Sequence, residues 1–333
     1  MRHVRISRIA LPLVGFLAAS MAPLVSGQDN DTGGGKRQIE AGMPPVMIHP
    51  TVEAAEHARG EFHSARPTRS KNLYYHGGVG GVGVETAPRI YLVFWGSQWN
   101  GNDPSGEASI LESFYSGVGG SSWLNSVTQY CEGVSTGTYF CNGAGQAAGN
   151  PGGIFAGYWY DNGSAAPSQP TQSQLAGEAA RAAANFGNTT ATANESVQYV
   201  IATATGNSAS GFGTQYCAWH SSTSSGYGNI AYTNLPYITD AGASCGANFN
   251  GLGATAGITI VGGHEMAETI TDQFPNGGWL DSGNSENGDK CAWISSGQGA
   301  SANVTFPNGS RFPVQSLWSN AYNNNAGGCV LSY

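Results

Sequence analysis

The sequence predicts a mixed α/β (α+β) domain with a central sheet, flanking helices and long loops rich in Gly and Ser. Two short runs of bulky apolar residues, 89–95 and 198–203, are typical of buried strands. A third segment, 256–272, carries apolar residues along a helix and stops before Pro275 and a Gly pair. Strands and helices together in one chain indicate a single mixed domain.

The chain before this domain divides into two parts. Residues 1–27 combine a basic start, an apolar run and small residues before a cut near Gln28, which is the pattern of a secretory signal peptide. Residues 28–71 are polar and interrupted by Gly and Pro, so we expect a disordered leader or a propeptide, with a plain linker as the alternative. Basic residues at 36–37 and 66–71 are candidate processing sites. The globular domain is expected over 72–333.

Further elements of the domain follow from local patterns. The segment from 104 to 115 predicts a helix, as does the Ala-rich segment 172–186, and the residues around 123–127 predict a short helix. Strand-like pieces occur within 211–240. Residues 142–170 are rich in Gly, Ala, Pro and Ser, and we expect a long surface loop there.

Charge excludes some classes of partner. Residues 72–333 carry 4 basic and 15 acidic residues, and such a surface repels nucleic acid and anionic membranes. After the signal peptide no other long apolar run exists, so we expect no membrane association once the signal is removed. A secreted monomer is the expectation.

The six cysteines can all pair in an exported chain. Cys131 and Cys141 bracket a short Gly- and Thr-rich stretch, which favours a local pair. Cys217 is then assigned to Cys245, and the last two residues pair by exclusion. Because six cysteines allow 15 connectivities, this scheme stays a hypothesis. The last pair is Cys291 with Cys329.

The predicted helix at 256–272 contains the pattern His-Glu-x-x-Glu. His264 and Glu268 are four residues apart, so their side chains project from one face. Many zinc hydrolases use this layout with His in the last place; two residues hold the metal and the intervening Glu handles a proton. His264 and Glu268 are therefore candidate metal ligands, and Glu265 is the candidate general base. The alternative is an ordinary amphipathic helix, since so short a pattern also arises by chance.

A third ligand can come from the acidic stretch that follows the helix. Glu286 is our first choice, because the chain between it and Glu268 is long enough to fold back. Asp289 and Asp281 are alternatives, either as ligands or as hydrogen-bond partners of the ligands. The stretch 281–289 also has a separate interpretation, as a Ca²⁺-binding loop or a solvated turn.

Two histidines outside the motif are further candidates. Either His76 or His220 could replace a carboxylate ligand or hydrogen-bond a reacting oxyanion, and we assign the catalytic role to His220. The alternative for both is a packed histidine with its hydrogen bonds satisfied. One imidazole and two carboxylates leave Zn²⁺ with no net charge, so the cation acidifies water weakly and the reaction depends strongly on Glu265 as base. Zn²⁺ is the expected ion, although a carboxylate-rich set also suits Mn²⁺ or Ca²⁺.

Several segments, taken in order, resemble a known family. They are 74–78 with 91–96, then 264–269 followed by Trp279, Glu286, Asp289 and Cys291, and finally 312–315 before Trp318. These residues resemble the plant EXORDIUM family, also called the phosphate-induced protein family, with details closer to its bacterial relatives. The resemblance covers 73–333. It implies an extracellular protein, and its His-Glu-x-x-Glu segment implies a zincin-like fold.

The sequence thus predicts a secreted, zincin-like, metal-dependent hydrolase. We expect an endopeptidase that acts on peptide or protein substrates through a general base, Glu265. The alternative belongs to another class: a non-catalytic extracellular or cell-wall-associated binding or signalling protein whose metal site only stabilises the fold.

Overall fold

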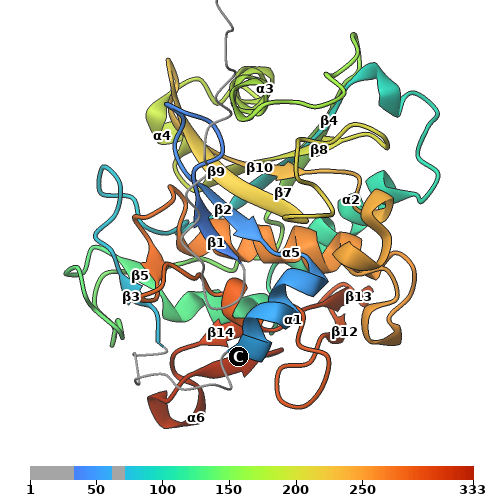
Figure 1. The fold of residues 1–333 in the computed structure, drawn as a ribbon. Helices are drawn as coiled ribbons and strands as arrows, with labels where there is room; N and C mark the ends of the chain where they lie inside the picture. The colour runs from blue at the N-terminus through green and yellow to red at the C-terminus, as the bar shows by residue number, and fades with distance from the viewer. Residues whose placement is uncertain (1–33, 62–71) are drawn as a thin grey trace, which may run out of the picture.

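The computed structural model describes residues 34–61 and 72–333 (Figure 1). The predicted signal peptide, 1–27, and the basic stretch 66–71 lie outside these residues. Within the described ranges, no helix is long and apolar enough to cross a membrane.

A seven-stranded sheet forms the centre of the molecule, in the order β1-β2-β9-β10-β8-β4-β7. Strands β10, β8, β4 and β7 are parallel, whereas β1, β2, β9 and β10 alternate in direction. The sheet is therefore mixed, as predicted. Its strands are β1 (Gly35–Arg37), β2 (Val46–His49), β4 (Arg89–Trp95), β7 (Phe155–Asp161), β8 (Val197–Thr203), β9 (Ala218–Ser225) and β10 (Gly228–Leu235).

Helices cover both faces of this sheet (Figure 1). On one face lie α3 (Gln172–Asn185), which starts with a capping box at Thr171, and the short α4 (Ala191–Asn194). On the other face lie α2 (Glu107–Val118) and α5 (Ala256–Thr271). Side chains of β4 alternate between the two resulting cores, because successive strand residues point to opposite faces.

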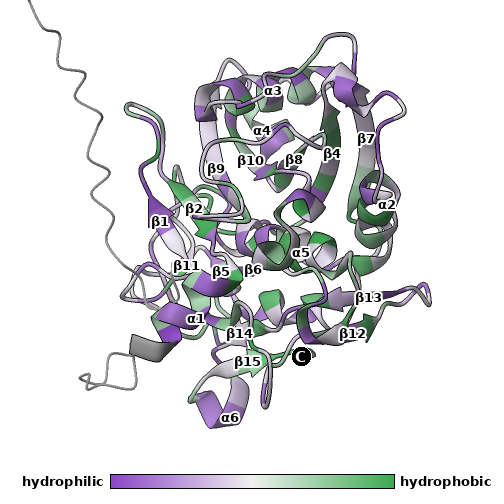
Figure 2. Cartoon of the chain, turned by 45° about the vertical axis from the view of Figure 1, so that its right-hand side comes forward, coloured by the Kyte–Doolittle hydropathy of each residue, from purple (hydrophilic) through white to green (hydrophobic). Residues whose placement is uncertain are grey.

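Figure 2 shows hydrophobic residues along β4 and β2, in the interior of this arrangement. The helices predicted from the sequence, including the short one now seen as η2 (Leu124–Gln129), are present. The expected strands in 89–95, 198–203 and 211–240 are present as β4, β8, β9 and β10.

Helix α5 is buried along its whole length. A C-terminal layer lies on the side of α5 away from the large sheet (Figure 1), and Thr259 donates a hydrogen bond to the carbonyl of Pro313 in that layer. The glycines of α5 permit close approach of α2: a Cβ on Gly262 would lie 3.1 Å from the Tyr115 hydroxyl. The polar side chains of α5 are therefore surrounded by other protein groups and not by solvent.

The C-terminal layer consists of short strands and turns. It includes η5 (Asp289–Cys291), β12 (Ala302–Thr305) paired with β13 (Arg311–Val314), β14 (Leu317–Ser319) paired with β15 (Gly328–Val330), and α6 (Tyr322–Asn325). Other small elements are β3 (Tyr74–Tyr75) paired with β11 (Trp279–Leu280), β5 (Cys131–Glu132) paired with β6 (Gln146–Ala147), and the turns η1 (Ser97–Trp99), η3 (Ile238–Cys245) and η4 (Phe249–Gly251). The disulfides join Cys131–Cys141, Cys217–Cys245 and Cys291–Cys329, the pairs expected from the sequence.

The long loop expected at residues 142–170 and the disorder expected at residues 34–61 are both wrong. Residues 142–170 contain β6 and β7, and β7 pairs with β4 as the edge of the large sheet. Residues 34–61 are not disordered: they form β1, β2 and the helix α1 (Val52–Glu61), and β2 is an inner strand beside β9. Pairing with β9 explains β2, because burial against a preformed sheet overrides weak local preference. Whether residues 28–71 are cleaved off stays a prediction.

Candidate metal centre

Helix α5 brings the three residues of the motif into the interior. His264, Glu265 and Glu268 are at most 1% exposed. Nε2 of His264 lies 3.0 Å from Oε2 of Glu268, one helical turn away, as the i,i+4 spacing requires. Neither atom has a hydrogen-bond partner in the described part of the chain. Two lone-pair-bearing atoms thus face one another across a short gap.

Gln315, which follows β13, fixes the protonation of His264. The amide nitrogen of Gln315 donates to the carbonyls of Gly288 (2.8 Å) and Ser316 (3.2 Å), which orients its Oε1. Oε1 lies 3.2 Å from Nδ1 of His264 and can only accept, so Nδ1 carries the proton. Nε2 is left as a lone pair, and burial lowers the pKa of His264 well below its usual value. This is the state in which histidine binds metals.

The turn around η5 returns two carboxylates to α5. Oδ1 of Asp289 lies 4.0 Å from Nε2 of His264, and the backbone N–H of Asp289 donates to Oε1 of Glu268 at 2.8 Å. Gly288 permits this approach, because a Cβ there would lie 2.6 Å from Nδ1 of His264 and 2.9 Å from Oε1 of Glu268. Glu286 is also fully buried, and both of its carboxylate oxygens lack hydrogen-bond partners among the described residues.

Strand β9 contributes His220 from the large sheet. Its Nδ1 lies 3.1 Å from Oε2 of Glu265 and 3.8 Å from Oε2 of Glu268, and its Nε2 lies 3.5 Å from Oε1 of Glu286. Burial alone would lower the pKa of His220, but the hydrogen bond to Glu265 and the surrounding carboxylates raise it. His220 therefore stands between the candidate base and a candidate ligand.

These residues form two ligand groups that share Glu268. One is His264, Glu268 and Asp289, and the other is His220, Glu268 and Glu286; in each, one ligand atom per residue lies within 4.8 Å of the others. Both groups are buried. Side-chain atoms without a hydrogen-bond partner in the described ranges gather here: His220 Nε2, His264 Nε2, Glu265 Oε1, Glu268 Oε2, both oxygens of Glu286, and Asp289 Oδ1.

Burial makes the charged forms of the carboxylates in this cluster unfavourable. Burial raises the pKa of Glu265 to about 8 and that of Glu268 to about 7, and it raises the pKa values of Glu286 and Asp289 well above the usual range. Among the ion pairs of the described residues, only histidines approach these four carboxylates. Buried carboxylates without partners are strongly unfavourable unless they are protonated or bind a metal.

The predicted ligands meet only in part. Glu286, our first choice for the third ligand, groups with His220, while the alternative Asp289 groups with His264. Asp281 lies outside both groups: its carboxylate accepts from Lys290 Nζ at 2.6 Å and from the backbone N–H of Gly283 at 2.8 Å, so it closes a turn. The calcium site predicted at 281–289 stays a prediction. His76 is also outside, stacked on Tyr74.

Sequence reasoning missed two residues of this site. Gln315 lies in a segment that carries the family resemblance, but its role is to orient His264. His49 of β2 places its ring centroid 3.9 Å from that of His264 and its Nε2 3.2 Å from the same Gln315 oxygen. Each of these two residues directly follows a short apolar run, His49 after 46–48 and Gln315 after 312–314. This position is the only sequence signal that marks them, and it is weak.

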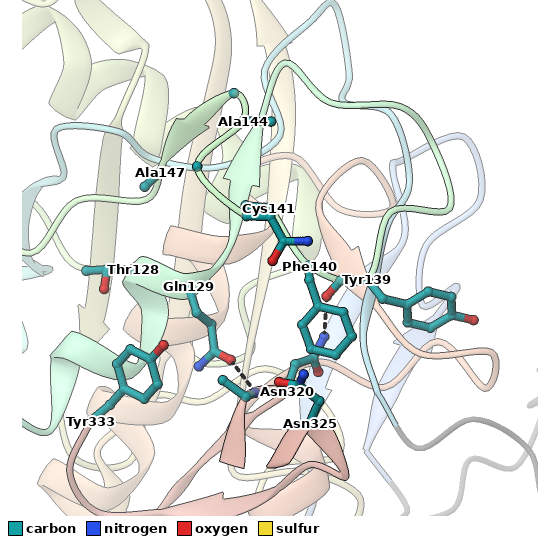
Figure 3. Close-up of a pocket in the computed structure, with 14 residues that line it drawn as sticks. Thr128, Gln129, Tyr139, Phe140, Cys141, Ala144, Ala147, Asn320, Asn325 and Tyr333 are labelled. Carbon is teal, nitrogen blue, oxygen red and sulfur yellow. Dashed lines mark hydrogen bonds between the residues drawn. The ribbon is translucent and has the colours of Figure 1, made fainter. Parts of the chain in front are cut away.

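A cavity elsewhere offers no comparable chemistry. It has a volume of about 410 Å³ and lies between η2, the segment 139–147 and the C-terminal layer (Figure 3). Its central amides serve the fold: Gln129 accepts from the backbone of Ala321, and Asn320 donates to the carbonyls of Leu73 and Tyr139. None of the candidate ligands lines it.

In comparisons with known proteins, no family model, no curated protein and no solved structure matches this chain.

Proposed function

We propose that the chain is a secreted, zincin-like, metal-dependent hydrolase that acts on peptide bonds, with Zn²⁺ as its cation. The observation that supports this best is the cluster of unpartnered, buried ligand atoms around Glu268, with Glu265 beside it. The three disulfides fit an oxidising, extracellular setting. We propose in addition that the chain is related to the EXORDIUM family, which its sequence resembles.

The donor set fits a zinc ion. Imidazole nitrogen and carboxylate oxygen are both ordinary zinc ligands, and His264, Glu268 and Asp289 would hold the ion. When bound, Zn²⁺ supplies a Lewis acid that polarises a carbonyl and lowers the pKa of a coordinated water. The helix fixes two of these ligands, and the hydrogen bond that Nδ1 of His264 donates to Gln315 fixes the ring of the first. Such preorganisation is what hydrolytic metal centres require.

Glu265 and His220 supply the proton chemistry. Oε1 of Glu265 has no hydrogen-bond partner in the described structure, so it can accept a proton from the attacking water. Oε2 of Glu265 is held by Nδ1 of His220. A proton taken by Glu265 can then pass to the leaving amine, while His220 holds the carboxylate in place. These are the roles of general base and positioning group.

The test compares two carboxylate-to-amide variants of the zinc-loaded protein. Glu265→Gln should reduce peptide hydrolysis by about 100-fold or more and retain the metal, because general-base catalysis contributes about 10²–10⁴-fold. Glu107→Gln is the matched control: Glu107 is equally buried, but it accepts a hydrogen bond from the backbone of Ile238 and lies outside both ligand groups. Equal activity of wild type and Glu265→Gln on a broad peptide library would overturn the proposal.

One observation favours a second candidate, a non-catalytic extracellular protein with a structural metal. All six side chains of the two groups and the base are at most 1% exposed, and structural sites are closed whereas catalytic ones keep an open position. This candidate predicts that removing zinc unfolds the protein and that no variant or treatment yields hydrolysis. Zinc-dependent hydrolysis that Glu265→Gln abolishes would exclude it.

A further inference from the structure

We infer that residues 34–61, here called the N-terminal cover, hold the metal centre closed, so that the chain with its cover in place is a latent form. The inference rests on the proposed function for the activity that is held back. It accounts for a centre whose ligands are buried although a hydrolase must admit its substrate.

The cover adds strands to the sheet beside the centre. Strand β2 pairs antiparallel with β9, and Met47 lies opposite His220 in this register. The N–H of Cys217 donates to the carbonyl of His49 at 2.9 Å, which extends the pairing. Residues 46–49 are all buried. Without the cover, β9 would be the edge of the sheet, and the backbone beside His220 would be open to solvent.

The cover also contacts two of the three candidate ligands of the first group, His264 and Asp289. The ring of His49 meets the ring of His264 edge to face, with centroids 3.9 Å apart. Gly34 rests on the carboxylate of Asp289, where a Cβ would collide with Oδ1. Two points of one short segment thus cover two of the three ligands.

The cover is anchored without covalent cross-links. The guanidinium of Arg59 in α1 donates to the carbonyls of Ala292 (2.6 Å) and Trp293 (3.0 Å), directly after η5. The indole N–H of Trp293 donates to the carbonyl of Pro50 at 2.8 Å. The three disulfides all join cysteines beyond residue 130. No disulfide therefore holds the cover in place, and it can be displaced without breaking a covalent bond, although Val46, Ile48 and Ala55 then leave the hydrophobic cores.

Displacement would create the surface that a polypeptide substrate needs. An exposed strand edge offers unpaired N–H and C=O groups to which an extended peptide adds as a further strand. The edge of β9 carries His220, so a peptide in the position of β2 would run past the metal centre. The cover therefore occupies the place of an extended polypeptide, which is the substrate class we assign.

Zinc extraction tests the closure independently of hydrolysis. The full-length secreted chain is loaded with zinc, and the rate of extraction by the chromogenic chelator 4-(2-pyridylazo)resorcinol is measured. Arg59→Ala removes an anchor that involves none of the candidate ligand side chains, and Gly34→Val pushes the cover off Asp289. Gly163→Val is the control, because a Cβ there meets nothing within 4 Å. We expect both cover variants to release zinc at least about tenfold faster than wild type and control, with faster deuterium uptake over residues 46–49.

Extraction rates and deuterium uptake that agree for wild type, both cover variants and control would overturn the inference. Hydrolysis separates this failure from failure of the proposed function. If the cover variants release zinc faster but hydrolyse nothing, the closure stands and the hydrolase proposal fails. If wild type hydrolyses peptides as fast as the cover variants do, the closure fails and the hydrolase proposal stands.

Discussion

Nε2 of His264 and Oε2 of Glu268 lie 3.0 Å apart without forming a hydrogen bond to each other or to any other described residue. Two atoms bound to one tetrahedral zinc ion at about 2.1 Å each are separated by about 3.4 Å. The observed gap is close to that value. We propose that the two atoms are ligands of one cation, which would account for a buried imidazole and a buried carboxylate that remain otherwise unpaired.

Gln315→Leu should weaken metal binding while leaving the fold intact. The substitution removes the acceptor of the His264 Nδ1 proton and frees the ring to turn. Loss of such a partner typically lowers metal affinity by about 10–100-fold. Competition with a chelator of known affinity measures the change. Gln98→Leu, which alters an amide that serves a surface loop, should bind zinc as wild type does, and equal affinity in both variants would refute the role of Gln315.

Gly288→Ala tests the spacing between the η5 turn and α5. The backbone of Gly288 is in the right-handed helical region (φ −78°, ψ −44°), so alanine is compatible with it. The added methyl would lie 2.6 Å from Nδ1 of His264, and overpacking of this kind costs about 1–3 kcal/mol. We expect zinc affinity to fall by about tenfold or more. Gly177→Ala on the surface of α3 serves as control; unchanged affinity in Gly288→Ala would show that the turn does not bear on the ligands.

Glu107 should make the stability of the protein depend on pH. Burial raises the pKa of Glu107 to about 8 from the ordinary value of 4.5. Its carboxyl is therefore neutral in the folded state, and its contribution to stability is fully present below pH 4.5 and lost as the pH rises through about 8. Glu107→Gln keeps the neutral form, so it should match wild type near pH 4 and exceed it near pH 9 by on the order of 2 kcal/mol.

Urea unfolding of the metal-loaded proteins at the two pH values measures this difference in the free energy of unfolding. Metal loading keeps the carboxylates of the candidate centre constant between the two proteins. A difference between wild type and Glu107→Gln that does not grow with pH would contradict the assignment.

Local sequence signals predicted the core of this fold. Strands β4 and β8 lie between helical layers and therefore read as continuous apolar runs. The apolar residues of α5 predict that helix correctly. The disulfide Cys217–Cys245, which precedes α5 in the chain, joins residues only 28 apart, so it could be predicted as well. Strand β7 escaped prediction because it is a half-exposed edge strand interrupted by Gly157, and only its pairing with β4 identifies it.

The sequence predicted the site residues that lie on α5, but it did not predict how residues from distant segments group with them. The i,i+4 spacing places His264 and Glu268 together by geometry alone. The choice between Glu286 and Asp289 depends on how the η5 turn closes over α5, which Gly288 and backbone hydrogen bonds decide. His49 reaches the site only because β2 enters the sheet, and no local pattern records a contact between residues so far apart.

The metal content of the purified chain shows whether the buried cluster around Glu268 binds a cation. After loading with zinc and extensive dialysis, elemental analysis should find about one equivalent of zinc per folded chain. Glu268→Gln, which alters the one residue common to both ligand groups, should lose it, whereas Glu107→Gln should keep it. A folded wild type that retains no stoichiometric zinc, manganese or calcium would contradict a metal centre at Glu268.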